Sequence, residues 1–146
     1  MTFSQINNTH VFNVRRVLIV DDEAAILFAY QKLIESEGYV VDVCESLEVC
    51  MTHIRTYDYC AVISDMRLGG FDNTDGLKVI LAVKEKQPAT KVILVTAFGN
   101  ADIEQMAYDL GANHYFEKPV QPVLILDALK SLFNSVLPEP NLRGMF

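Results

Sequence analysis

Five short apolar runs, separated by longer segments with apolar residues at helical spacing, constrain the fold of this chain more than any other feature. Four of the runs are β-branched or otherwise strand-like enough to be buried on both faces, as parallel strands flanked by helices must be. The runs occupy residues 17–20, 40–44, 60–64, 92–96 and 114–116.

The segments between these runs carry apolar residues three or four positions apart, which predicts amphipathic helices. Each apolar stripe can cover one face of a sheet. The stripes are Ile26, Tyr30, Leu33 and Ile34, then Leu47, Cys50, Met51 and Ile54, then Leu77, Ile80 and Leu81, and finally Ile103, Met106, Ala107 and Leu110.

Residues that start and stop helices stand at the expected places. Gly38 and Gly111 fall where residues in the left-handed conformation would end the first and fourth helices. Asn100, and either Thr74 or Asp75, can cap helix starts. A last helix is predicted over 122–137, where two prolines follow it at positions 138 and 140.

Repeated strand–helix units with short connections predict right-handed crossovers and an open parallel sheet. The expected fold class is therefore α/β, a (βα)5 three-layer sandwich with helices on both faces of the sheet. Ligands of such folds bind beyond the carboxyl ends of the strands. The residues that follow each run are therefore the candidates for function.

Composition limits the classes of protein to which the chain can belong. The 146 residues are 51% apolar, with a formal net charge of -7 and a pI near 4.8. This is enough apolar material for one domain without disulfides, and the acidic balance argues against nucleic acid as a direct partner. Cys44, Cys50 and Cys60 lack C-x-x-C spacing and are interpreted as reduced structural residues.

No apolar run approaches the roughly 18 residues of a membrane span, and the first twelve residues lack the features of a signal peptide. We therefore expect no membrane association and a cytoplasmic location. The expected organisation is a flexible leader over 1–14, one domain over 15–137 and a tail over 138–146. The tail is too short for an effector domain, so the chain is either a stand-alone domain or one excised from a longer protein.

Charged and polar residues follow the runs at the strand ends. Asp21 and Asp22 come after the first run, Asp65 after the third, Thr96 ends the fourth, and Lys118 follows the fifth. Taken singly, each residue has an ordinary structural explanation: the acids as residues at a helix start, the threonine as a strand residue and the lysine as a surface residue. Together they form a cluster of carboxylates that makes physical sense only around a cation, and oxygen ligands favour Mg²⁺.

The segments RVLIVDDE, AVISDMRL, VILVTAFG and HYFEKP resemble the signature segments of the response-regulator receiver family of two-component signalling, the chemotaxis-type receivers. The similarity runs from about residue 15 to residue 137. The resemblance implies a flavodoxin-like fold with strand order 2-1-3-4-5. It also implies a phosphorylation-dependent switch that is not a turnover enzyme, since it catalyses only its own phosphotransfer and dephosphorylation.

The resemblance also implies metal and phosphate roles for single residues. Asp65 matches the phosphoacceptor, and Asp22 matches the direct Mg²⁺ ligand. Asp21 matches the residue that acts through a metal-bound water. Asp65 and the backbone carbonyl of Arg67 would complete the protein ligands, and Lys118 would pair with a phosphoryl oxygen.

Three more positions match the family's switch and backbone features. Thr96 matches the hydroxyl that moves toward the phosphate, and Tyr115 matches the aromatic residue that turns inward with it, although a merely half-buried strand aromatic is the alternative. Pro119 matches the position that makes the Lys–Pro peptide cis. The chain departs from the family where Gly69 replaces a proline and Gly76 lies eleven residues after Asp65, which lengthens this loop by about three residues.

The expected phosphodonor is a phosphohistidine on a sensor histidine kinase or a histidine phosphotransfer protein. The expected output face comprises the fourth helix, the fifth strand and the last helix, and it would bind an output protein or a second copy of the chain. A phosphate-independent interaction module is the alternative. A related Mg²⁺-dependent phosphatase is disfavoured, because Arg67 stands where a second aspartate would act as general acid. A flavin site is disfavoured by the acidic loop after the first run.

Overall fold

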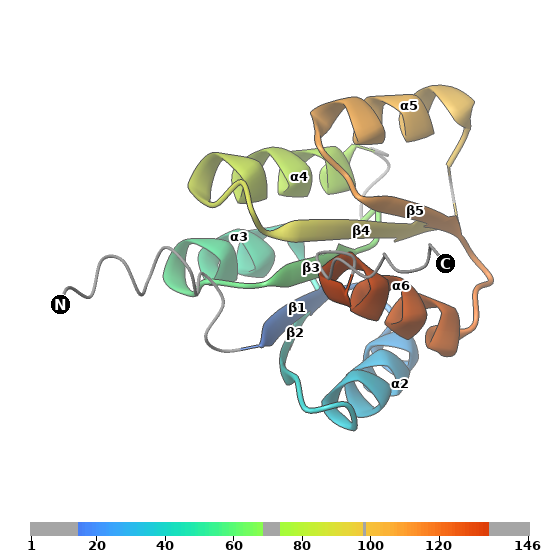
Figure 1. Ribbon diagram of the computed structural model, residues 1–146. Coiled ribbons are helices and arrows are strands. Elements are labelled where there is room, and N and C mark those ends of the chain that lie inside the picture. Colours follow the sequence, from blue (N-terminus) through green and yellow to red (C-terminus); the bar gives the residue numbers. More distant parts are fainter. Residues whose placement is uncertain (1–14, 69–73, 98, 135–146) are drawn as a thin grey trace, which may run out of the picture.

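The computed structural model describes residues 15–68, 74–97 and 99–134, which form a parallel five-stranded sheet with helices on both faces (Figure 1). The strand order is β2-β1-β3-β4-β5, and every neighbouring pair is parallel. This confirms the predicted α/β class, the (βα)5 topology and the 2-1-3-4-5 order. The strands are β1 (Arg16–Val20), β2 (Val40–Cys44), β3 (Ala61–Ser64), β4 (Lys91–Thr96) and β5 (His114–Glu117).

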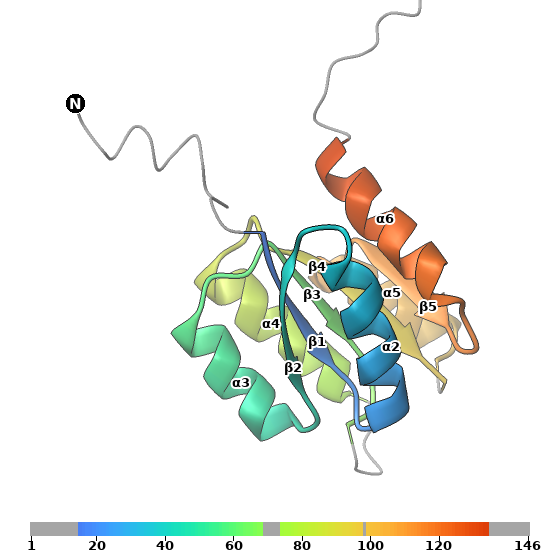
Figure 2. The same ribbon diagram turned by 90° about the horizontal axis from the view of Figure 1, so that it is seen from below.

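The helices form the two outer layers, with α2 and α6 on one face of the sheet and α3, α4 and α5 on the other (Figures 1 and 2). Alternate strand residues point to opposite layers, so that Val17 and Ile19 pack with α2 and α6 while Leu18 and Val20 pack with α3, α4 and α5. The helices are α2 (Ala24–Glu35), α3 (Leu47–Thr56), α4 (Asp75–Lys86), α5 (Ala101–Leu110) and α6 (Pro122–Asn134).

The predicted apolar stripe of α2 is partly wrong. Tyr30 and Ile34 are buried as expected, but Leu27 is the third buried residue, and Ile26 and Leu33 are only half-buried. The buried residues of α2 lie along the line from position 27 through 30 to 34, so a stripe that starts at position 26 turns partly toward solvent.

The predicted stripes of α4 and α5 are each wrong at one residue. Leu81 is 50% exposed and Met106 is 46% exposed, whereas Leu77, Ile80 and Ala107 are buried as expected. Leu81 and Met106 therefore lie on the solvent side of their helices.

The helix ends agree with the predicted signals. Gly38 and Gly111 both have a positive φ, of 93° and 117°, which residues with a Cβ rarely adopt. The side chain of Asn100 accepts a hydrogen bond from the backbone N–H of Ile103, and Thr74 occupies the N-cap position of α4. The predicted continuation of α6 to residue 137 lies outside the described residues, as do the proposed leader and tail.

The three cysteines lie in the apolar layers on the two faces of the sheet. Cys44, Cys50 and Cys60 are buried and free of disulfides. None of the helices in the described part of the chain has the length and apolar character required to cross a bilayer.

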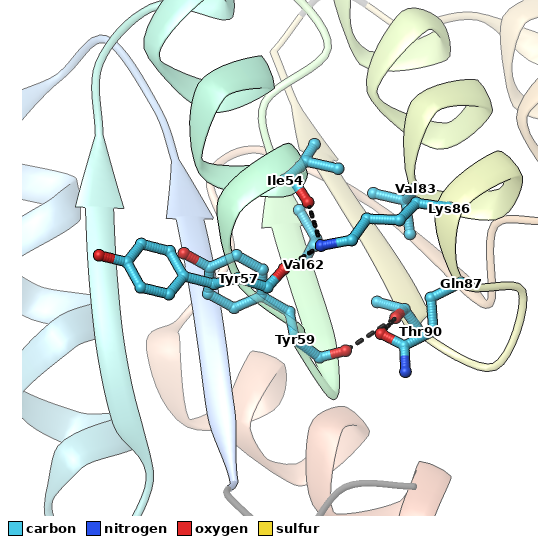
Figure 3. Close-up of a pocket in the computed structure, with 8 residues that line it drawn as sticks. All are labelled: Ile54, Tyr57, Tyr59, Val62, Val83, Lys86, Gln87 and Thr90. Atoms are coloured by element: carbon cyan, nitrogen blue, oxygen red, sulfur yellow. Dashed lines mark hydrogen bonds between the residues drawn. The ribbon is translucent and has the colours of Figure 1, made fainter.

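At the end of the sheet where β3 and β4 begin, the side chains of Lys86 and Thr90 link the end of α3 and the segment after it to the end of α4 and the segment after it (Figure 3). The Lys86 Nζ donates to the carbonyls of Ile54 and Tyr57, each at 2.6 Å, and so caps the end of α3. The Thr90 hydroxyl donates to the Tyr59 carbonyl at 2.7 Å. The space between these groups, about 10 Å³, is close to that of a single water molecule, so the feature is structural and not a ligand site.

We predict that Thr90→Val lowers the free energy of unfolding by about 1–3 kcal/mol, because it removes the buried donor to the Tyr59 carbonyl without changing the side-chain shape. Urea unfolding at neutral pH measures the effect. The control is Thr52→Val, whose hydroxyl bonds an exposed helix carbonyl and whose loss should matter less. Equal effects of the two substitutions would contradict the importance of the buried bond.

Candidate functional site

The site lies where β1 and β3 end, and backbone hydrogen bonds continue the sheet pairing into it. The Asp65 N–H donates to the Val20 carbonyl at 2.9 Å, and the Asp21 N–H donates to the Cys44 carbonyl at 3.2 Å. Both aspartates are buried, with 2% of Asp21 and 7% of Asp65 exposed. The sheet therefore holds two carboxylates side by side at one edge, where they are largely shielded from water.

Lys118 reaches the same edge from the connection after β5. Its Nζ lies 2.7 Å from Asp21 Oδ2, 3.1 Å from Asp65 Oδ2 and 3.4 Å from Glu23 Oε1. The Lys118 N–H donates to the Thr96 carbonyl at 2.8 Å, which ties this connection to the end of β4. The peptide bond between Lys118 and Pro119 is cis.

The electrostatics of the site are set mainly by burial. Burial raises the pKa of Asp21 and of Asp65 above the ordinary aspartate value, although hydrogen bonds and attraction from Lys118 act in the opposite direction. Burial disfavours the charge on Lys118, but its bonds to the two carboxylates outweigh this and raise its pKa. One ammonium group therefore does not fully compensate the buried acids.

Three carboxylates of the site fit a divalent cation. Asp21, Asp22 and Asp65 each offer an oxygen, and these oxygens all lie within 4.8 Å of one another. All three are hard oxygen ligands of the kind that Mg²⁺ and Ca²⁺ prefer. The incomplete compensation of the buried acids supports the fit, because a cation there would stabilise their ionised forms. Arg67 lies beside them, and its backbone N–H donates to Asp65 Oδ1 at 3.3 Å.

Thr96 and Tyr115 lie on neighbouring strands next to this cluster. Thr96 is fully buried at the end of β4, and Tyr115 is half-buried on β5, where it packs against the core beneath α4 and α5. The Tyr115 hydroxyl oxygen is buried, and no hydrogen-bond partner for it is found in the described part of the chain. This hydroxyl lies beside Gly99, in the space that a Cβ would fill if residue 99 were not glycine. The same Cβ would lie 3.1 Å from Thr96 Cγ2, so Thr96 borders this space too.

The site includes residues to which the sequence patterns assigned no role. Glu23 contacts Lys118. Its position directly after the two aspartates is the sequence feature that could have predicted a place in the site. Gly99 admits the Tyr115 hydroxyl, and only the packing reveals this. An open hollow of about 560 Å³ lies beside Lys118, with Ile26, Tyr30 and Val120 in its lining. Gly69 and most of the lengthened loop lie outside the described residues.

Comparisons with known proteins give a consistent result. The family model of the response regulator receiver domain matches residues 17–130. The acid tolerance regulatory protein ActR of Sinorhizobium medicae is 33% identical over 115 residues, which are 79% of this chain. The chain spans 58% of the length of ActR.

Two solved structures are similar in fold over most of the chain. A CheY-like response regulator receiver domain protein from Methanospirillum hungatei superposes with a TM-score of 0.77 at 25% identity, covering 84% of this chain and 96% of that one. The beryllofluoride-activated NtrC4 receiver domain dimer gives a TM-score of 0.75 at 29% identity, covering 85% of this chain and 100% of that one.

We predict that Asp65→Asn stabilises the metal-free protein at neutral pH. The pKa of Asp65 is raised in the folded state. Its contribution to the free energy of unfolding is therefore fully present below the unfolded aspartate pKa of about 3.9, and it is lost as pH rises through the folded-state pKa. The difference between variant and wild type should therefore be small near pH 4 and grow toward pH 7. Urea unfolding in EDTA measures it, with Asp127→Asn on the exposed face of α6 as the control.

We further predict that Gly99→Ala moves the Tyr115 hydroxyl out of its buried position, because the new Cβ would overlap it. Burial raises the pKa of Tyr115, so this pKa should fall toward the ordinary tyrosine value in the variant. An NMR pH titration of the Tyr115 ring resonances in wild type and variant measures it. An unchanged Tyr115 titration in a folded variant would show that Gly99 does not control the ring.

Proposed function

The chain belongs to the response regulator receiver domain family, and on this premise we propose that it is a phosphorylation-dependent switch of a two-component phosphorelay. In this proposal Asp65 accepts a phosphoryl group from a phosphohistidine of a sensor histidine kinase or a histidine phosphotransfer protein. The observation that carries the proposal is the contact of Lys118 Nζ with Asp65, at 3.1 Å, within a group of three carboxylates that fits a divalent cation.

The proposed transfer forms a bond between an Asp65 oxygen and phosphorus while the N–P bond of the donor breaks. The electron pair of that bond returns to the imidazole nitrogen, so no external oxidant or reductant is needed. Asp65 must be ionised to attack, and Lys118 favours the ionised form by its hydrogen bond. The open hollow beside Lys118 gives a donor side chain room to approach this edge of the sheet.

Positioning and charge stabilisation are most of what a protein must supply in phosphoryl transfer, because charge spreads over the three equatorial oxygens of the transition state. Asp21, Asp22, Asp65 and the Arg67 carbonyl would hold Mg²⁺, which would neutralise part of that charge when bound. Lys118 would bind one phosphoryl oxygen. Its present contacts with Asp21 and Asp65 hold the ammonium at the edge where that oxygen would arrive.

The proposed output runs through Thr96 and Tyr115. The Thr96 hydroxyl would bind another phosphoryl oxygen, and Tyr115 would respond because both residues border the same space beside Gly99. The face built by α5, β5 and α6 would then bind an output protein or a second copy of this chain. Water attack on the same phosphorus would reverse the switch. The proposal assigns no further catalytic residue to either step.

Intact-protein mass after incubation with Mg²⁺ and acetyl phosphate tests the proposal. We expect the wild-type protein to gain one phosphoryl group, and we expect neither Asp65→Ala nor wild type in EDTA to do so. Asp58→Ala, which changes an exposed acid far from the site, should behave as wild type. A folded wild-type protein that gains no phosphoryl group from this donor or from a histidine phosphotransfer protein would favour the phosphate-independent interaction module.

A further inference from the structure

The start of α4 is bonded directly to the chain segment that follows Asp65. The Asp75 carboxylate is 7% exposed, and its Oδ2 accepts a hydrogen bond from the Leu68 N–H at 3.0 Å. The Gly76 N–H donates to the Met66 carbonyl at 2.8 Å. A Cβ at Gly76 would lie 2.8 Å from Met66 Cα and 3.2 Å from the Asp65 carbonyl oxygen, so the helix start touches this backbone with no space between them.

These bonds fix one particular peptide unit. The Leu68 N–H and the Arg67 carbonyl belong to the same planar trans peptide, and in such a unit the N–H and the C=O point in opposite directions. A bond that aims the N–H at Asp75 therefore also sets the direction of the Arg67 carbonyl. That carbonyl is the backbone group to which the proposed function assigns a place among the Mg²⁺ ligands.

The bond is not an ordinary feature of a helix start. Thr74 already occupies the N-cap position of α4, and Asp75 follows it as the first helical residue. An acid at that place usually interacts with the free N–H groups of its own helix or with solvent. Here one carboxylate oxygen instead reaches back seven residues to Leu68, in a buried position, while the other lies 3.9 Å from Lys78 Nζ.

We propose that Asp75 is a positioning residue for the cation site: its carboxylate orients the Arg67–Leu68 peptide so that the Arg67 carbonyl can bind Mg²⁺ together with the three aspartates. The inference rests on the proposed function, because it concerns the same cation. Outer partners that orient ligands commonly change metal affinity by about 10-fold to 100-fold when they are removed.

The test measures the Mg²⁺ dissociation constant of the unphosphorylated protein by isothermal titration calorimetry. We expect Asp75→Ala to weaken Mg²⁺ binding by about 10-fold or more. Asp75→Asn keeps an oxygen that can accept from the Leu68 N–H, so it should bind Mg²⁺ within about 3-fold of wild type. Lys78→Ala removes the neighbour of the second carboxylate oxygen and leaves the bond from the Leu68 N–H to Asp75 in place. It is the matched control, and it should bind Mg²⁺ as the wild type does.

Urea unfolding of the same variants in EDTA separates positioning from stability alone. If Asp75→Ala lowers the free energy of unfolding but leaves the Mg²⁺ dissociation constant unchanged, the proposal is wrong. The proposal would also be overturned if Asp75→Asn bound Mg²⁺ as weakly as Asp75→Ala. Such a result would mean that Mg²⁺ affinity does not depend on an oxygen at residue 75 that accepts from the Leu68 N–H.

A measurement on the wild-type protein keeps the proposal testable if Asp75→Ala does not fold. The carbonyl carbon-13 resonance of Arg67 should shift when Mg²⁺ is added, since a ligating carbonyl changes its electronic surroundings. A resonance that stays in place while Mg²⁺ binds would overturn the inference and leave the phosphoacceptor role of Asp65 intact. Absence of any Mg²⁺ binding by wild type would instead refute the proposed cation site, and this inference with it.

Discussion

The contact of the Lys118 ammonium with the Asp21 and Asp65 carboxylates is the interaction on which the site depends. Burial makes both carboxylates costly to ionise, and the ammonium offsets only part of that cost, since the pKa of each acid remains raised. An edge of this kind has an unmet requirement for positive charge. In the proposed function, a divalent cation would meet this requirement.

The fold supports this unfavourable arrangement by separating it from the core. Two apolar clusters, one on each face of the sheet, contain the fully buried apolar residues of the strands, and the acids begin only where the strands end. Backbone bonds from Asp21 to Cys44 and from Asp65 to Val20 extend the sheet by one residue at those points. The acids are therefore held by rigid backbone, while the apolar layers supply the stability that the site does not.

Two structural links leave the site toward different helices. One runs from Thr96 past Gly99 to Tyr115 and so toward the face formed by α5, β5 and α6. The other runs from the backbone after Asp65 to Asp75 and Gly76 at the start of α4. The first would let the site change a surface that a partner reads, whereas the second would hold a ligand group still. In the proposed function these two roles are complementary.

The sequence by itself determined the strands, the helices and the residues that gather at the strand ends, because the buried runs, the helical spacing and the glycine stops are local properties of the chain. It predicted less well which side of α2 faces the sheet, where Leu27 is buried and Ile26 is half-exposed. Only the tertiary structure decided the contacts between residues far apart in sequence. Three such contacts depend on how separate elements pack: the Lys118 bonds to Asp21 and Asp65, the space for the Tyr115 hydroxyl at Gly99, and the bond from Leu68 to Asp75. No local sequence pattern encodes the distance or the direction between residues on different elements.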